Sequence, residues 1–419
     1  MAREDNRRNW WRVLAVGMLL ATATACGLRS SALEVAGPTT TRPPTAVVQT
    51  TTTVPTTTVP TTTTTMAPTT TTIPIGLERP TACKLRASAQ PDIGLSFPRS
   101  GDRIPASGTV RAAVLFADFH DAHATLAPED VLAMISPGVS DYFTAVSYGR
   151  MNLVLEPVLE WLTLSRPAWE YVDGLEDVYL HKDQIQEAID LAQHDGPLPS
   201  TDVVVVMNDP DAPIPYGPTF TGRTAEEYLD FGGEHIKNGI TSGQDLYYWG
   251  YLWLNHEIGH SLGLTDLYRY ETQSFEWTGE FSLMGDIGGT APELFAYERW
   301  LLGWLDDNQI LCVSEGEHVV SLTAVELGGE TTAVIVPRAG SRIVVIESRR
   351  PIGLDSALLT PGALVYTVDS SIEAGYGPII VENGGETIQP GESVSIDGVT
   401  VTVLEDRADG YIVGVTISD

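Results

Sequence analysis

The sequence predicts an α+β (α/β) domain over residues 80–305, followed by an all-β, sandwich-like domain over residues 306–419. Two apolar runs without alternation, at 110–119 and 202–208, are typical of strands buried on both faces. Helical spacing of apolar residues occurs between them. After about residue 306 the pattern changes to short β-branched runs punctuated by Gly and Pro. The helical segments are 141–147 and 183–194, and the later runs include 333–337, 343–347 and 399–404.

Length and charge limit the class of protein. The chain has 419 residues, 43% of them hydrophobic, so most of it can form a globular core. Residues 80–419 exceed the size at which a single core usually stops growing, which favours two domains. A formal charge of −31 repels phosphates, so we expect no nucleic acid partner.

The first 25 residues predict a secretory leader. Four Arg precede an apolar run over residues 13–25, which is too short to span a bilayer as a helix. Small residues then precede Cys26, as in the lipobox of bacterial lipoproteins. We therefore expect lipidation of Cys26 and a location on the extracellular face of the bacterial cell membrane. A plain signal peptide of a secreted protein, or an uncleaved anchor, is the alternative.

Residues 26–79 predict a disordered tether. Thr and Pro dominate residues 37–75 of this segment, and TTTVP occurs twice, at 51–55 and 56–60. Such a composition lacks the apolar side chains that offset the entropy cost of ordering.

Two cysteines remain in the folded part, Cys83 and Cys312. Outside the cytoplasm such a pair can form a disulfide, which would connect the start of the first domain to the second. Two separate buried thiols are the alternative.

The most informative segment is HEIGHSLGLTD, which contains His256, Glu257, His260 and Asp266. Histidines at i and i+4 lie one turn apart on one helix face, so both imidazoles can bind one ion, most naturally zinc. Glu257 can accept a proton from water without being a ligand. Gly263 can end the helix and turn the chain so that Asp266 becomes the third ligand.

The third ligand has alternatives in the sequence. Asp266 could instead brace the turn, with Glu293 or Glu298 supplying the carboxylate. Met284 follows His260 at a distance where metzincin-type zincins place a Met-containing turn, although any buried Met would look identical.

These segments together resemble the immune-inhibitor-A family of secreted bacterial metallopeptidases. The resemblance is carried by HEIGHSLGLTDLY, SLMG at 282–285, WLLGW at 300–304, VLFADF at 114–119 and DYFTAVSYGRMN at 141–152. It implies a metzincin-like catalytic domain, a catalytic zinc and endopeptidase activity, with calcium as a further cofactor for which no ligand set stands out. Thr265 stands where the family often has Pro.

The expected activity is hydrolysis of peptide bonds in extracellular proteins by zinc-activated water, with Glu257 as the general base. Tyr268 or Tyr297 could donate a hydrogen bond to the oxyanion, but ordinary packing is the simpler interpretation of each. We expect a monomer that acts on protein or peptide substrates. A surface adhesion lipoprotein with a non-catalytic zinc, or a cell-wall amide hydrolase, is the alternative. The sequence leaves open whether residues 77–110 form an inhibitory pro-segment and what the second domain does.

Overall fold

The computed structural model describes residues 80–418 apart from residues 91, 175 and 176. Helices and strands are mixed in the first part of this range, and strands dominate after residue 310. The predicted mixture, with mostly strands in the C-terminal part, is confirmed. The predicted leader and tether, including Cys26, lie outside the described residues. In the described part, no helix combines the length and apolar character needed to cross a membrane.

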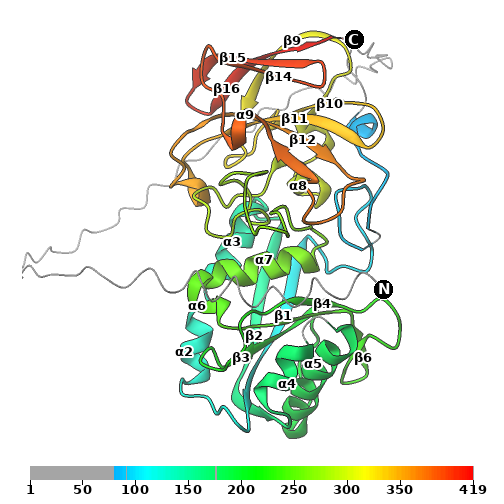
Figure 1. Ribbon diagram of the computed structural model, residues 1–419, viewed down its shortest axis with the longest axis vertical. Helices are drawn as coiled ribbons and strands as arrows, with labels where there is room; N and C mark the ends of the chain where they lie inside the picture. Colours follow the sequence, from blue (N-terminus) through cyan, green and yellow to red (C-terminus); the bar gives the residue numbers. More distant parts are fainter. Residues whose placement is uncertain (1–79, 91, 175–176, 419) are drawn as a thin grey trace, which may run out of the picture. The chain divides into compact units, whose positions relative to one another are not determined.

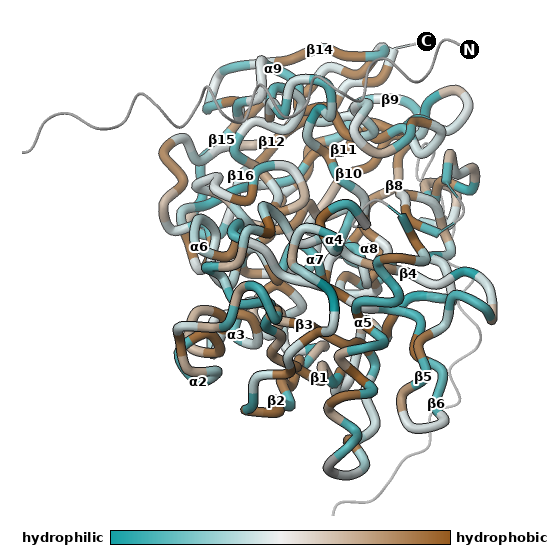
Figure 2. The backbone as a smooth tube through the Cα atoms, turned by 60° about the horizontal axis from the view of Figure 1, so that its bottom comes forward, coloured by the Kyte–Doolittle hydropathy of each residue, from teal (hydrophilic) through white to brown (hydrophobic). Residues whose placement is uncertain are grey.

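A five-stranded sheet with the order β2-β1-β3-β7-β4 organises the first part. All neighbouring strands in it are parallel except β4, which is antiparallel to β7 and forms an edge. Figure 2 colours β1 and β3 largely as hydrophobic. The strand bounds are β1 Gly108–Phe119, β2 Met151–Leu164, β3 Val203–Asn208, β4 Thr219–Thr221 and β7 Asn238–Thr241.

Both faces of this sheet are covered, as an unbroken apolar strand requires. Alternate residues of β1 belong to two different apolar clusters: Val114 and Phe116 to one, Leu115 and Ala117 to the other. Helices α3 and α7 contribute to the first cluster, and α5 contributes to the second. In Figure 1, α4 and α5 lie side by side. The bounds are α3 Gly138–Val146, α4 Ala168–Gly174, α5 Val178–Ala192 and α7 Tyr251–Ser261.

The remaining helices and strands of the first part are short. They are η1 Pro80–Cys83, α2 Pro128–Ala133, η2 Gln193–Asp195, β5 Leu229–Phe231, β6 Glu234–Ile236, α6 Asp245–Trp249 and α8 Ala296–Leu301.

The C-terminal part contains two sheets, with the orders β13-β12-β11-β10-β8 and β14-β15-β16-β9. Side chains from both sheets share one apolar cluster, for example Val344 of β11 and Val413 of β16. The bounds are η3 Asp307–Gln309, β8 Ile310–Cys312, β9 Gly316–Thr323, β10 Ala333–Pro337, β11 Arg342–Arg349, η4 Gly353–Asp355, β12 Gly362–Asp369, β13 Ile379–Val381, α9 Glu382–Gly385, β14 Ser393–Ile396, β15 Val399–Arg407 and β16 Gly410–Ile417.

Several interactions cross residue 305, where the sequence predicts a domain boundary. The first apolar cluster contains residues from both sides, such as Trp300 and Tyr366. A disulfide joins Cys83 of η1 to Cys312 of β8, with their Cα atoms 6.0 Å apart. These contacts connect the C-terminal strands directly to the part that contains α7.

Candidate metal centre

The two histidines of the motif lie on α7. This helix starts directly after Gly250, whose φ of 54° separates it from α6. His256 and His260 are one turn apart, so their side chains lie on the same face of the helix. Their ring centroids are 4.8 Å apart, with the ring planes at 89° to each other. The helix therefore presents both imidazoles to one point.

A turn after α7 brings Asp266 to the same point. Gly263 has a φ of 98°, a conformation that favours glycine, and it redirects the chain after the helix. Asp266 Oδ1 lies 3.0 Å from Nε2 of His256 and 3.3 Å from Nε2 of His260. One ligand atom from each of the three residues lies within 4.8 Å of the other two.

Backbone carbonyls orient both imidazoles. Nδ1 of His256 donates to the carbonyl oxygen of Leu283 at 2.9 Å, and Nδ1 of His260 donates to that of Leu264 at 3.0 Å. Each Nδ1 therefore carries a proton, and each Nε2 is the ring atom that faces Asp266. This is the arrangement that metal-binding histidines usually have. Two neutral imidazole nitrogens and one carboxylate fit a zinc ion that keeps a further position for water.

The alternative ligands Glu293 and Glu298 are engaged elsewhere. Glu293 forms a buried ion pair with Arg299. Glu298 accepts hydrogen bonds from the Ser282 hydroxyl at 2.8 Å and from the backbone N–H of Phe295 at 2.9 Å. Neither belongs to the His256, His260 and Asp266 group.

Asp266 is itself held on two sides. The hydroxyl of Tyr270 donates to Asp266 Oδ2 at 2.7 Å, and the N–H of Gly375 donates to the Asp266 carbonyl at 3.3 Å. Burial and the Asp266 charge raise the pKa of Tyr270, so its hydroxyl keeps the proton that it donates. Gly375 belongs to the loop between β12 and β13, so the C-terminal part reaches the site.

Charge at the site is balanced between the imidazoles and the carboxylate. Burial lowers the pKa of His260, but the charge and hydrogen bond of Asp266, with the charge of Glu257 and the hydrogen bond to Leu264, together outweigh burial and raise it to about 9. Burial likewise raises the pKa of Asp266, and the two imidazoles outweigh it and hold that pKa far below its ordinary value. The metal-free site therefore holds protons that a divalent cation would displace on binding.

Glu257 lies beside this group without belonging to it. The side chain is 9% exposed, and the Thr219 hydroxyl on edge strand β4 lies 2.7 Å from Glu257 Oε2. The same hydroxyl lies 2.8 Å from the Glu257 carbonyl oxygen. Burial raises the pKa of Glu257, and the charges of His260 and His256 oppose that rise. A carboxylate with a raised pKa suits a group that takes up and releases a proton.

Met284 packs under the helix. It is fully buried, and a Cβ atom added to Gly259 would lie 2.5 Å from its sulfur. The glycine between the two histidines thus permits a close approach of this side chain. The carbonyl of Leu283, the preceding residue, orients His256.

The two tyrosines that the sequence offers as oxyanion donors lie in different places. Tyr297 is buried, and its hydroxyl donates to the Leu95 carbonyl at 2.7 Å, which is a packing role. Tyr268 lies near the site, with its ring centroid 6.4 Å from that of His256.

Within residues 80–418, leaving out residues 91, 175 and 176, His256, His260 and Asp266 are the one group of three or more His, Cys, Asp or Glu side chains placed to hold a metal. In the part of the chain that the structure describes, the acidic residues Asp209 and Asp211 after β3, and Asp306 and Asp307, belong to no such group. Calcium therefore stays a prediction without a site.

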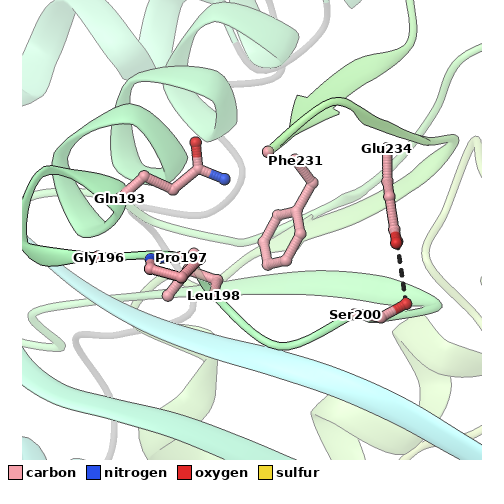
Figure 3. Close-up of a pocket in the computed structure, with 8 residues that line it drawn as sticks. Gln193, Gly196, Pro197, Leu198, Ser200, Phe231 and Glu234 are labelled. Atoms are coloured by element: carbon pink, nitrogen blue, oxygen red, sulfur yellow. Dashed lines mark hydrogen bonds between the residues drawn. The ribbon is translucent and has the colours of Figure 1, made fainter.

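A separate hollow lies between the end of α5 and the β5–β6 hairpin (Figure 3). Its volume is about 280 Å³, and it shares no residue with the metal group. The Ser200 hydroxyl donates to Glu234 Oε2 at 2.9 Å within it, so its one carboxylate is already paired. This hollow has no evident part in the chemistry of the site.

Four interactions at the site escape sequence reasoning: the Thr219 hydroxyl, the Tyr270 hydroxyl and the carbonyls of Leu264 and Leu283. Backbone carbonyls leave no trace in a residue pattern. Thr219 is 38 residues from Glu257, so only the folded chain brings the two together.

No family model matches the chain, and the search of curated proteins found no match to it. The resemblance to immune-inhibitor-A peptidases therefore stays a prediction, and the case for a function rests on the geometry of the chain's own residues.

Proposed function

We propose that this chain is a zinc-dependent, metzincin-like endopeptidase that hydrolyses peptide bonds of extracellular proteins. The observation that supports this best is the orientation of His256 and His260 by backbone carbonyls, with both Nε2 atoms turned toward Asp266. A purely structural site has no use for the Glu257 carboxylate, which lies beside the metal group and is held by the Thr219 hydroxyl.

His256, His260 and Asp266 would hold the zinc. When bound there, zinc would supply Lewis acidity, which lowers the pKa of water toward about 7 and polarises a carbonyl group. The Glu257 carboxylate takes a proton from the attacking water as the water oxygen adds to the scissile carbonyl carbon. It then delivers that proton to the amide nitrogen as the C–N bond breaks, so that a carboxylic acid and an amine leave. Thr219 keeps the Glu257 side chain in place for both transfers.

The test measures hydrolysis of casein by the full chain, with and without a chelator and after zinc is added back. We expect activity that the chelator abolishes and zinc restores. Glu257→Gln should bind zinc but lose casein hydrolysis, because the amide cannot take the proton. Glu317→Gln, which changes an exposed carboxyl on β9, is the matched control and should keep full activity.

Two outcomes would replace the proposal. Stoichiometric zinc without cleavage of any protein would favour a surface adhesion lipoprotein with a non-catalytic metal. Cleavage of peptidoglycan but not of casein would favour a cell-wall amide hydrolase.

We also propose that Cys26 anchors the chain to the outer face of the bacterial cell membrane. The leader and the small residues before Cys26 support this. Cys26→Ala should move the protein from the membrane fraction to the culture medium or leave it uncleaved, and unchanged lipid labelling would contradict the proposal.

A further inference from the structure

The segment of residues 92–104, here called the positioning segment, covers the C-terminal end of α7. The last carbonyls of a helix have no partner within the helix and need one elsewhere. Four successive carbonyls, from His260 to Gly263, accept hydrogen bonds from this segment. The donors are Arg103 Nη1 to His260 at 3.2 Å, the N–H of Ile104 to Ser261 at 3.1 Å, Arg99 Nη1 to Leu262 at 2.7 Å and the N–H of Gly94 to Gly263 at 3.1 Å.

Two of these donors are guanidinium groups at the negative end of a helix, where positive charge is favourable. Arg103 is 8% exposed. Burial lowers its pKa to about 10, with the charge of Asp92 opposing, so it stays protonated at neutral pH. Arg99 also donates to the carbonyl of Ile104 at 2.9 Å, which fixes the segment to itself.

Arg103 contacts both the end of α7, which carries His260, and strand β4, which contacts Glu257. Its Nη1 lies 2.5 Å from the Thr221 hydroxyl on β4, and the same nitrogen donates to the His260 carbonyl. Strand β4 also carries Thr219, which contacts Glu257. One buried side chain thus links the end of the helix that carries His260 to the strand that holds the general base.

The polar contacts of the positioning segment go to the backbone at the end of α7 and not to the side chains of the metal group. Within the described residues, no hydrogen bond or ion pair joins residues 92–104 to the side chains of His256, Glu257, His260 or Asp266. The segment also contributes to the core, because Leu95 and Ile104 are buried in the apolar cluster that contains α7. A removable inhibitor would be expected to contact the side chains that hold the metal, whereas this segment contacts backbone carbonyls at the C-terminal end of α7.

We propose that residues 92–104 are a permanent positioning segment of the metal site, with Arg99 and Arg103 as positioning residues, and not an inhibitory pro-segment. The effect of this segment on catalysis rests on the proposed function, whereas its effect on metal binding does not. The contacts themselves fix where His260 sits, and with it one of the two imidazoles that would hold the metal.

The first test measures the rate at which zinc passes from the loaded full chain to a coloured chelator. Changes in residues that orient metal ligands typically cost about 10- to 100-fold in metal affinity. We expect a loss of zinc faster by about tenfold or more in Arg99→Ala and in Arg103→Ala. Arg99→Lys should restore most of the retention, because a lysine amine can still donate to the Leu262 carbonyl.

Arg223→Ala is the matched control. Arg223 pairs with Asp92 at 2.7 Å, as Arg103 does at 3.5 Å, but among the contacts of the described residues it donates to no carbonyl of α7. Its zinc retention should equal that of the wild type. Equal retention in Arg99→Ala, Arg103→Ala and Arg223→Ala, each with a wild-type circular dichroism spectrum, would overturn the proposal. If Arg103→Ala does not fold, Arg99→Ala and Arg99→Lys decide the question alone.

The second test cuts the chain within the positioning segment. Gly101 and Asp102 form an exposed turn, and a recognition sequence for a specific protease can be inserted between them. The disulfide from Cys83 to Cys312 keeps the cut piece attached until it is reduced. Casein hydrolysis should not rise after the cut, either before or after reduction. A rise at either step would identify an inhibitory segment and overturn the proposal.

The two proposals can fail separately. Zinc retention is measured without a peptide substrate, so a chain that binds zinc but cuts no protein refutes only the proposed function. If the wild type binds no zinc, the proposed function fails, and amide hydrogen exchange tests the segment instead. The amides of Gly263 and Leu264 should then exchange faster in Arg99→Ala than in Arg223→Ala, and equal rates would refute the inference.

Discussion

Removing one oxygen atom beside the candidate metal ligand should weaken metal binding without disturbing the fold. In Tyr270→Phe the hydroxyl that donates to Asp266 Oδ2 at 2.7 Å is lost. The ring should stay in place, because it packs on the backbone of Gly375 and lies near Tyr268 and Tyr376, with centroid distances of 5.6 Å and 6.4 Å. The change therefore isolates the hydrogen bond.

The expected magnitude follows from the charge of the acceptor. A hydrogen bond to a charged group contributes about 1.5–3 kcal/mol. Loss of a partner that orients a metal ligand typically lowers metal affinity by about 10- to 100-fold, which corresponds to about 1.4–2.7 kcal/mol. The two ranges agree, so we expect the zinc dissociation constant of Tyr270→Phe to rise by about 10- to 100-fold.

The assay is competition for zinc against a chromogenic chelator, and Tyr297→Phe is the matched control. Tyr297 is also buried, and its hydroxyl also donates over 2.7 Å, but to the Leu95 carbonyl. The control should lose about 1 kcal/mol of stability in urea denaturation and keep the wild-type zinc affinity. Equal zinc affinities for the two variants would refute the role assigned to the Tyr270 hydroxyl.

Three further predictions test other parts of the chain. Thr219→Val removes the hydroxyl at Glu257, so kcat for peptide hydrolysis should fall by about 10- to 100-fold with little change in KM; an unchanged kcat would count against a positioned base. Replacing Cys83 and Cys312 together by Ser should lower the free energy of unfolding in urea by about 2–5 kcal/mol, and no change would show that the disulfide is not formed. Burial raises the pKa of Glu298 to about 7. The folded chain then keeps a proton that the unfolded chain releases near pH 4.3, so the free energy of unfolding falls as pH rises between those values. In Glu298→Gln the free energy of unfolding should fall less over this pH range. Thermal denaturation below and above the range measures this, and an equally steep fall in the variant would contradict the raised pKa.

The elements that sequence patterns predicted are those whose signal is local. Strands β1 and β3 are buried on both faces, so they appear as unbroken apolar runs. Helix α3 follows from its apolar spacing and ends before Gly149, which has a φ of 75°. In each case the residues that decide the structure are neighbours in the chain.

Strand β2, in contrast, has no local pattern that predicts it. It lies at the edge of the sheet, and its residues are partly exposed, with Glu156, Pro157 and Glu160 among them. Pro is tolerated on an edge strand because one side of the strand has no partner to receive an N–H. The segment therefore lacks both an apolar run and a clean alternation, and only its pairing with β1 defines it. Helix α5 likewise begins earlier than its apolar spacing indicates, at Val178, where the Asp177 side chain accepts from two backbone N–H groups.

In the candidate site, too, local features could be predicted and contacts between distant residues could not. The motif places His256, His260 and Asp266 together because one helical turn and one glycine turn are sufficient to do so. The orientation of those ligands depends instead on two backbone carbonyls, on Tyr270 and on the carbonyl contacts of residues 92–104. Carbonyl groups are identical in every residue, so no substitution pattern records which of them a ligand uses. A chain with the same motif on a differently supported helix would keep the ligands and lose their orientation. Measurements that separate metal affinity from folding are therefore the ones that can show what the rest of this chain contributes to the motif.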